Sequence, residues 1–320
     1  MRYKAKFQQY LDETAQIKDG YLQVGSFSYP PSEVLEAIDE ISFNEQYDEW
    51  YQNELDIILG IAASSYPYPI ARYAAVVLDE YDNCNHRLQA LRSLWECIIN
   101  FMFALIIGEC THLDLNLSSS ELSGKPLKFS DCYTEKIALK IAISKVLITT
   151  DFDKEPLFKN LFTPELCDDL SELNKQRNKI QHALAQDEDM SKSLFDSLID
   201  DVNRVLYDLN ELENIRCMIY KSSQSSPTEI IFGVLSGDSG IPKNKDGTII
   251  DGEVLQKLKK GHVFIENNGL LFNISPFFIY LNKKIAYHKK SKNIYSDIAD
   301  SSKEYNLDFS PEWDLIKKIF

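Results

Sequence analysis

The chain has 320 residues, 44% of them hydrophobic, which is enough for one large or two ordinary domains with a buried core. Its formal net charge of −15 argues against broad electrostatic capture of nucleic acid, although it leaves room for a local basic cleft. The six cysteines stand singly, without a CxxC or a paired Cys/His spacing, so neither a zinc site, nor a disulfide framework, nor a cofactor is expected.

The sequence does not predict a membrane protein. The N-terminal residues lead into polar sequence rather than an apolar signal segment. The longest apolar run, residues 94–107, is too short for a membrane span and is interrupted by Glu96 and Asn100. We therefore expect a cytoplasmic chain that does not contact a membrane.

The first half of the chain changes from an extended arm to helices. Residues 1–31 are polar and aromatic, with short extended pieces beside glycines, and predict a strand-like arm. Helical patterns follow from residue 33 and over about residues 45–62. The strongest helical material runs from residue 70 to about residue 110, and its apolar spacing is typical of the core helix of a bundle.

Further helices are expected after a loop at residues 111–134, the first of them beginning at Glu135. The pattern Thr163–Pro164–Glu165 predicts the start of the next helix, with Thr as N-cap, Pro at the first helical position and an acid in the first turn. Its apolar residues recur near the helical period. They are Leu166, Leu170, Leu173, Ile180 and Leu184. A last long helix follows the acidic turn at residues 187–189.

Arg177, Asn178 and His182 lie beside this apolar stripe in the helix after Thr163. A guanidinium is permanently charged and matches phosphate geometry, whereas an imidazole can take or give a proton near neutral pH. Together they suit cleavage of an RNA phosphodiester. His182 would deprotonate the ribose 2′-hydroxyl or protonate the leaving oxygen, and Arg177 would stabilise the charge on the phosphorane. This chemistry requires no metal.

The five-residue spacing places Arg177 and His182 roughly 140° apart around an α-helix. Asn178 and His182 are i,i+4 neighbours instead, so Asn178 could orient the imidazole. One helix therefore supplies at most half of an active site. This points to a homodimer.

The order Arg177–Asn178–x–x–x–His182 resembles the R-[polar]-x(3)-H signature of HEPN domains. These are helical bundles common in bacterial toxin–antitoxin, abortive-infection and CRISPR-associated ribonucleases. The resemblance implies that two protomers face their motifs across a shared cleft and cut RNA without metal. It makes Arg177 and His182 catalytic and Asn178 supporting, and it implies a cognate antitoxin or a defence-system partner protein.

The helix predicted over residues 70–110 resembles the first long helix of such domains, which often places an acid near the position of Glu96. Glu96 could therefore pair with Arg177 in the cleft. A helix–helix ion pair with a purely structural role is the alternative. Some toxin relatives carry a tyrosine two residues after the histidine, where this chain has Leu184, so the tyrosine-linked regulation of those relatives is not carried over.

The sequence changes character at the Ser-rich residues 222–227, which we take as a domain boundary. Strand-like runs follow at 229–235, 248–250, 262–266, 270–274 and 277–281. Asn267–Asn268–Gly269 between two of them predicts a hairpin turn. Lys289, Lys290 and Lys292 form a basic edge among tyrosines that could guide RNA, although lysines are also common on solvated strand edges.

Two short patterns in this part are predicted to be turns without a function. Gly237–Asp238–Ser239–Gly240 matches the string around a serine-protease nucleophile, but a catalytic triad is recognised by geometry rather than by a string. Residues 244–253 resemble an EF-hand loop except at the first ligand, where Pro242 stands.

The sequence thus predicts a mainly α fold. A HEPN-like antiparallel helical bundle is expected over residues 32–221, preceded by an N-terminal arm at 1–31 and followed by a small β-rich (α+β) accessory domain at 228–320. The expected function is that of a metal-independent endoribonuclease, a homodimer that cuts RNA in antiviral defence or as a toxin. The alternative is a catalytically inactive HEPN-like module that binds a partner protein or nucleotide, with the C-terminal domain as sensor.

Overall fold

The computed structural model describes residues 16–18, 21–24, 27–29, 40–79, 83–186, 188–223, 229–238, 243–249, 261–267, 269–281, 284–290, 294–298 and 303–320. The chain divides into two compact units, Met1–Ile58 and Leu59–Phe320. Helices and antiparallel strands both contribute, which confirms the predicted mixture of α and β structure.

The described strands of the first unit form one small antiparallel sheet. β1 (Gln16–Lys18) pairs with β2 (Tyr21–Val24), which also pairs with β3 (Phe27–Tyr29). The arm predicted for residues 1–31 is therefore strand-like where it is described. The start expected for a helix at residue 33 lies outside the described residues. The next helix, α3 (Glu40–Ser65), extends beyond both ends of the predicted range.

The second unit is built around α5 (Cys84–Leu113). Asn83 begins it as N-cap, because its side chain accepts a hydrogen bond of 2.8 Å from the backbone N–H of His86. Every residue from 97 to 110 is buried, as expected for a helix that is apolar all round. Among the described helices, α5 alone is long and apolar enough to cross a membrane, but 83% of its most apolar stretch is buried inside the structure. This burial is compatible with a soluble protein.

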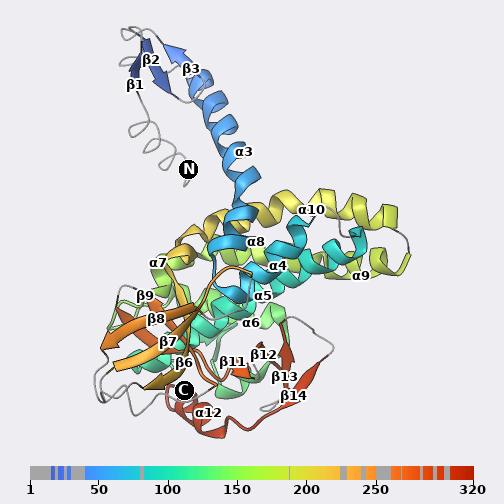
Figure 1. The fold of residues 1–320 in the computed structure, drawn as a ribbon. Helices are drawn as coiled ribbons and strands as arrows, with labels where there is room; N and C mark the ends of the chain where they lie inside the picture. The colour runs from blue at the N-terminus through green and yellow to red at the C-terminus, as the bar shows by residue number, and fades with distance from the viewer. Residues whose placement is uncertain are drawn as a thin grey trace. The chain divides into compact units, whose positions relative to one another are not determined.

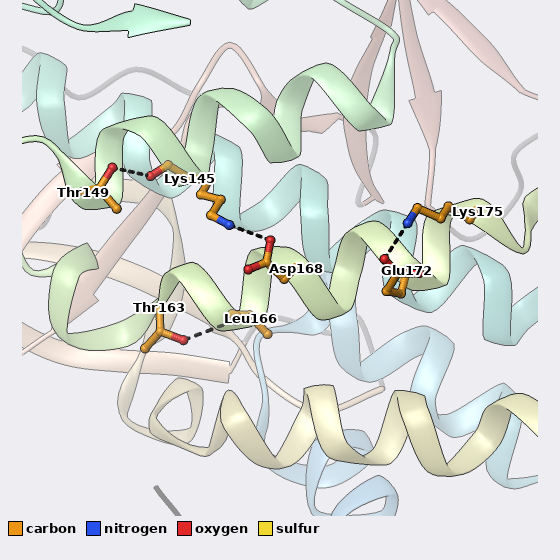
Figure 2. A network of polar contacts seen from close by, with 7 residues as sticks. All are labelled: Lys145, Thr149, Thr163, Leu166, Asp168, Glu172 and Lys175. Carbon is orange, nitrogen blue, oxygen red and sulfur yellow. Dashed lines mark hydrogen bonds and ion pairs between the residues drawn. The ribbon is translucent and has the colours of Figure 1, made fainter. Parts of the chain in front are cut away.

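Other helices of this unit cover α5 on several sides (Figure 1). They are α4 (Tyr68–Leu78), α6 (Ile137–Thr149), α7 (Phe158–Leu161), α8 (Pro164–Lys175), α9 (Arg177–Gln186) and α10 (Glu188–Asp208). In Figure 1 the chain turns back between α9 and α10, and these two helices pack against each other. The predicted start of α8 is confirmed: the Thr163 hydroxyl accepts from the backbone N–H of Leu166 at 3.2 Å (Figure 2). Figure 2 also shows the exposed ion pair between Lys145 of α6 and Asp168 of α8.

Two antiparallel sheets follow the helices. The five-stranded sheet has the order β10 (Leu270–Asn273), β9 (Val263–Asn267), β6 (Arg216–Ser223), β7 (Glu229–Leu235) and β8 (Lys243–Ile249). The four-stranded sheet has the order β11 (Phe278–Leu281), β12 (Lys284–Lys290), β13 (Ile294–Asp297) and β14 (Glu304–Asn306). A short hairpin, β4 (Glu121–Leu122) and β5 (Lys125–Pro126), lies within the loop predicted at residues 111–134. The predicted hairpin turn joins β9 to β10, with Gly269 at a φ of +88°.

Three features of the C-terminal part differ from the prediction. β6 begins at Arg216, ahead of the Ser-rich segment, because it is an inner strand that pairs with β7 on one side and β9 on the other. β8 covers Asn244 to Gly247, so the turn expected there is wrong: the segment pairs with β7. The chain also ends in an unpredicted helix, α12 (Ser310–Lys317), whose Trp313 is fully buried.

Gly108 marks a close contact between α5 and the strands. A Cβ at this position would lie 2.8 Å from the backbone oxygen of Asn273 and 3.1 Å from the Ile274 side chain. The ring of Phe103, on the same helix, packs edge to face against the ring of Phe277, which lies just before β11, at a centroid distance of 5.4 Å. The absence of a side chain at Gly108 therefore lets the helical and β-rich parts of this unit approach closely.

We expect Gly108→Ala to lower the free energy of unfolding by about 1–3 kcal/mol, because the added methyl group must displace a backbone carbonyl in a packed core. Gly60→Ala is the matched control, since Gly60 also lies in a helix but a Cβ there would meet no described atom within 4 Å apart from the backbone of its own helix. That control should be neutral or stabilising by up to about 1 kcal/mol. Urea unfolding compares the two variants, and a Gly108→Ala protein as stable as the control would contradict the close contact.

Candidate active site

The segment that carries the motif is two helices rather than one. α8 ends at Lys175, Gln176 forms a turn, and α9 begins at Arg177. The N–H of Gln176 bonds to the carbonyl of Leu173 at 3.0 Å, which is the tighter pattern of a helix end, and regular bonding resumes where Ile180 donates to Gln176 at 3.1 Å. The prediction of one continuous helix is therefore wrong at Gln176. Arg177 and His182 still share a single helix, α9.

The burial of α9 decides which of its side chains meet solvent. Ile180 and Ala183 are buried at 0% and 1% exposure and hold the helix against the core. Asn178 and His182 are exposed, and neither makes a hydrogen bond or ion pair with any residue that the structure describes. The imidazole is thus accessible to solvent. The orienting role of Asn178 stays a prediction.

Arg177 is bound to the neighbouring core helix by a carboxylate. Its Nε lies 2.7 Å from Oε1 of Glu96 on α5 and forms an ion pair with it. The same oxygen accepts from Nε of Arg92, one turn earlier on α5, at 2.9 Å. Arg92 also donates from a terminal amino group to the side-chain oxygen of Gln181 on α9, at 3.2 Å. The pairing suggested for Glu96 and Arg177 is therefore present, within a group of four side chains that we call the Glu96 cluster: Arg92, Glu96, Arg177 and Gln181.

The Glu96 cluster lies at the boundary between core and solvent. The side chains of Arg92 and Glu96 are 17% and 21% exposed, whereas that of Arg177 is 39% exposed. Two guanidiniums share one carboxylate, which leaves a formal surplus of one positive charge in a strongly acidic chain. This local surplus is suited to an anionic ligand.

A buried lysine lies behind the Glu96 cluster. Lys140 of α6 is 3% exposed and donates to the side-chain oxygen of Asn100 at 2.6 Å. The Asn100 amide in turn donates to the backbone carbonyl of Glu96 at 2.8 Å. Burial lowers the pKa of Lys140 to about 8, because a low-polarity environment disfavours the charged amine. The helical period could have revealed this residue, since position 140 shares the inner face of α6 with Ile137 and Ser144.

The lysines proposed to guide RNA are only partly described. Lys289 pairs with Glu304 of β14 at 2.7 Å, which offsets its charge. Lys290 lies on β12 in register with Ile294 of β13. Lys292 lies outside the described residues. A role for these lysines stays a prediction.

The remaining histidines and cysteines have other surroundings. His262 and His288 are buried, and His262 lies 3.1 Å from the Glu312 carboxylate of α12. His86 and His112 lie in the first and last turns of α5. Five of the six cysteines are buried, and burial raises the pKa of each of those thiols, which disfavours the reactive thiolate. No group of three or more His, Cys, Asp or Glu able to hold a metal ion occurs among the described residues.

Comparisons of the chain with known proteins add no relative. No family model, no curated protein and no solved structure matches it.

Proposed function

We propose that this chain is a metal-independent endoribonuclease that acts as a homodimer. The observations that best support the proposal are the solvent exposure of the two motif side chains on α9 and the contact that holds one of them. His182 is exposed, while Arg177 is partly exposed and fixed in place by Glu96. A proton-transferring group has to be reachable by the RNA, and a charge-stabilising group has to be held before the reaction begins.

The reaction follows from these two groups. His182 takes the proton of a ribose 2′-hydroxyl, and the resulting oxygen attacks the adjacent phosphorus. The bond to the 5′-oxygen of the next nucleotide breaks, and that oxygen leaves with the proton that the His182 imidazole has taken up. The products are a 2′,3′-cyclic phosphate and a 5′-hydroxyl. Arg177 donates from its terminal amino groups to the phosphorane, while its Nε remains on Glu96.

A second copy of the chain completes the site in this proposal. Within one α9, Arg177 and His182 leave the helix about 140° apart and are separated by about 7.5 Å along its axis. To face one phosphate together, Arg177 would have to reach round the helix, or each residue would have to meet its counterpart from another chain. Two facing α9 helices would bring His182 of one chain toward Arg177 of the other.

The wider biological role rests on the resemblance to HEPN domains. The helices α5, α8, α9 and α10 are the part of the chain that we propose to correspond to the HEPN-like bundle. A cytoplasmic location, antiviral or toxin-like RNA cleavage, and a cognate antitoxin or defence-system partner belong to the same proposal.

Purified protein is expected to cut a mixed RNA pool in the presence of EDTA. Arg177→Ala should lower the rate by about 10²- to 10³-fold, because it removes a donor aimed at the developing charge. Arg204→Ala is the matched control, since Arg204 is an exposed arginine of α10 that pairs with Asp201. RNA binding without cleavage would favour the alternative of an inactive binding module. Equal cleavage by wild type and Arg177→Ala would contradict the proposed endoribonuclease activity of this site.

A further inference from the structure

Arg92 has no part in the proposed reaction, yet it is joined to the same carboxylate oxygen as Arg177. Both guanidiniums pair with Glu96 Oε1 through Nε, at 2.9 Å for Arg92 and 2.7 Å for Arg177. One arginine comes from α5 and the other from α9, so Glu96 holds together two cationic groups from different helices.

The atoms that make these contacts decide what is left for a ligand. A guanidinium carries five N–H donors, and its two terminal amino groups form the edge that matches two oxygens of a phosphate. The contact with Glu96 uses the Nε of each arginine. Arg92 is additionally oriented by Gln181, which accepts from one terminal amino group at 3.2 Å. No residue in the described part of the chain accepts a hydrogen bond from the terminal amino groups of Arg177.

The charge of the cluster agrees with this geometry. One carboxylate shared by two guanidiniums leaves a positive surplus, and the Arg177 end of the cluster is the more exposed. Because an RNA strand carries one negative charge per nucleotide, two neighbouring cations can engage two successive phosphates.

We propose that Arg92 is a substrate-binding residue that contacts a phosphate next to the scissile one, with Glu96 and Gln181 holding its guanidinium in place. The ligand class is a single-stranded RNA backbone. The inference rests on the proposed function, in which Arg177 binds the scissile phosphate. Arg92 contacts a phosphate that does not react, so its contact is the same before and during the reaction.

The test is binding of a short oligonucleotide with 2′-O-methyl groups throughout, which cannot be cut by 2′-hydroxyl attack. Fluorescence anisotropy at several salt concentrations is expected to give a Kd about tenfold higher for Arg92→Ala than for wild type. The plot of the logarithm of the binding constant against the logarithm of the salt concentration should become less steep, by the contribution of about one phosphate contact. Arg204→Ala serves as control and should bind like wild type. Arg92→Gln provides a second variant that removes the charge but keeps a side-chain N–H donor.

Cleavage kinetics on ordinary RNA separate this inference from the proposed function. Arg92→Ala should raise KM by about tenfold with kcat nearly unchanged, since the contact is uniform in ground and transition states. Wild-type affinity in both Arg92 variants would overturn the inference even if the enzyme cuts RNA. A fall in kcat with unchanged Kd would also overturn it, because Arg92 would then act only through Glu96. If RNA binding depends on Arg92 but the wild-type protein does not cleave RNA, the result would support this binding site and contradict the proposed nuclease activity.

Discussion

Replacing His182 by alanine is expected to lower the rate of RNA cleavage by about 10²- to 10⁴-fold, the usual contribution of a general acid or base. The side chain is exposed on α9 and bonds to no described residue. Its removal should therefore change the free energy of unfolding by less than about 0.5 kcal/mol. A large loss of rate with unchanged stability would place the effect in the reaction rather than in the fold.

His86→Ala is the matched control for this variant. His86 is exposed in the first turn of α5 and has no part in the proposed reaction. It should cut RNA at the wild-type rate. A His182→Ala protein that is folded and equally active would rule out the acid–base role and leave α9 as a surface helix.

The second large effect concerns the buried amine of Lys140. Burial lowers its pKa to about 8 from the ordinary lysine value of 10.5. Between these two pH values the unfolded chain keeps the proton that the folded chain has lost, so stability must rise with pH across this window. Relative to Lys140→Met, the wild-type protein should gain a free energy of unfolding on the order of a few kcal/mol between pH 8 and 10.5. Lys140→Met also removes the hydrogen bond to Asn100, and this loss changes the variant's free energy of unfolding by an amount that does not depend on pH.

Lys145→Met on the same helix is the control for this measurement. Lys145 is exposed, and its hydrogen bond to Asp168 raises the pKa of its amine. A raised amine pKa gives stability that is lost, not gained, as pH rises through it. Urea unfolding of the three proteins at pH 7.5, 9 and 10.5 gives the comparison. A flat difference between wild type and Lys140→Met would contradict the buried neutral amine.

Local signals in the sequence predicted the parts of the fold that depend on a few neighbouring residues. Thr163 and Pro164 placed the start of α8 because an N-cap and a proline at the first helical position act within one turn. The turn around Gly269 was predictable because only a few residues adopt a positive φ readily.

Other features depend on contacts between distant segments. The break at Gln176 was missed because the apolar period continues across it from Leu173 to Ile180. β6 was missed because its strand conformation depends on pairing with β7 and β9, which follow it in the chain. Propensity carries little information about such tertiary effects.

The candidate site, too, has residues that local sequence signals predicted and one whose role depends on contacts between distant segments. Arg177 and His182 were predicted from residue chemistry, and Glu96 as the partner of Arg177 from the resemblance of its helix to the first long helix of HEPN domains. Arg92 was not singled out, since an Arg–Glu pair at i,i+4 is common on helix surfaces. Its significance appears only when α9 brings Arg177 to the same carboxylate.

The most direct test of the proposed chemistry is a single change in the substrate. An RNA that wild-type protein cuts at one mapped position is remade with a 2′-O-methyl ribose just before the scissile phosphate. Attack by the 2′-hydroxyl predicts that this bond is no longer cut in EDTA, while the unmodified RNA yields a 2′,3′-cyclic phosphate and a 5′-hydroxyl. Cleavage of the modified RNA at the same bond and rate, or products with 5′-phosphate ends, would contradict the account.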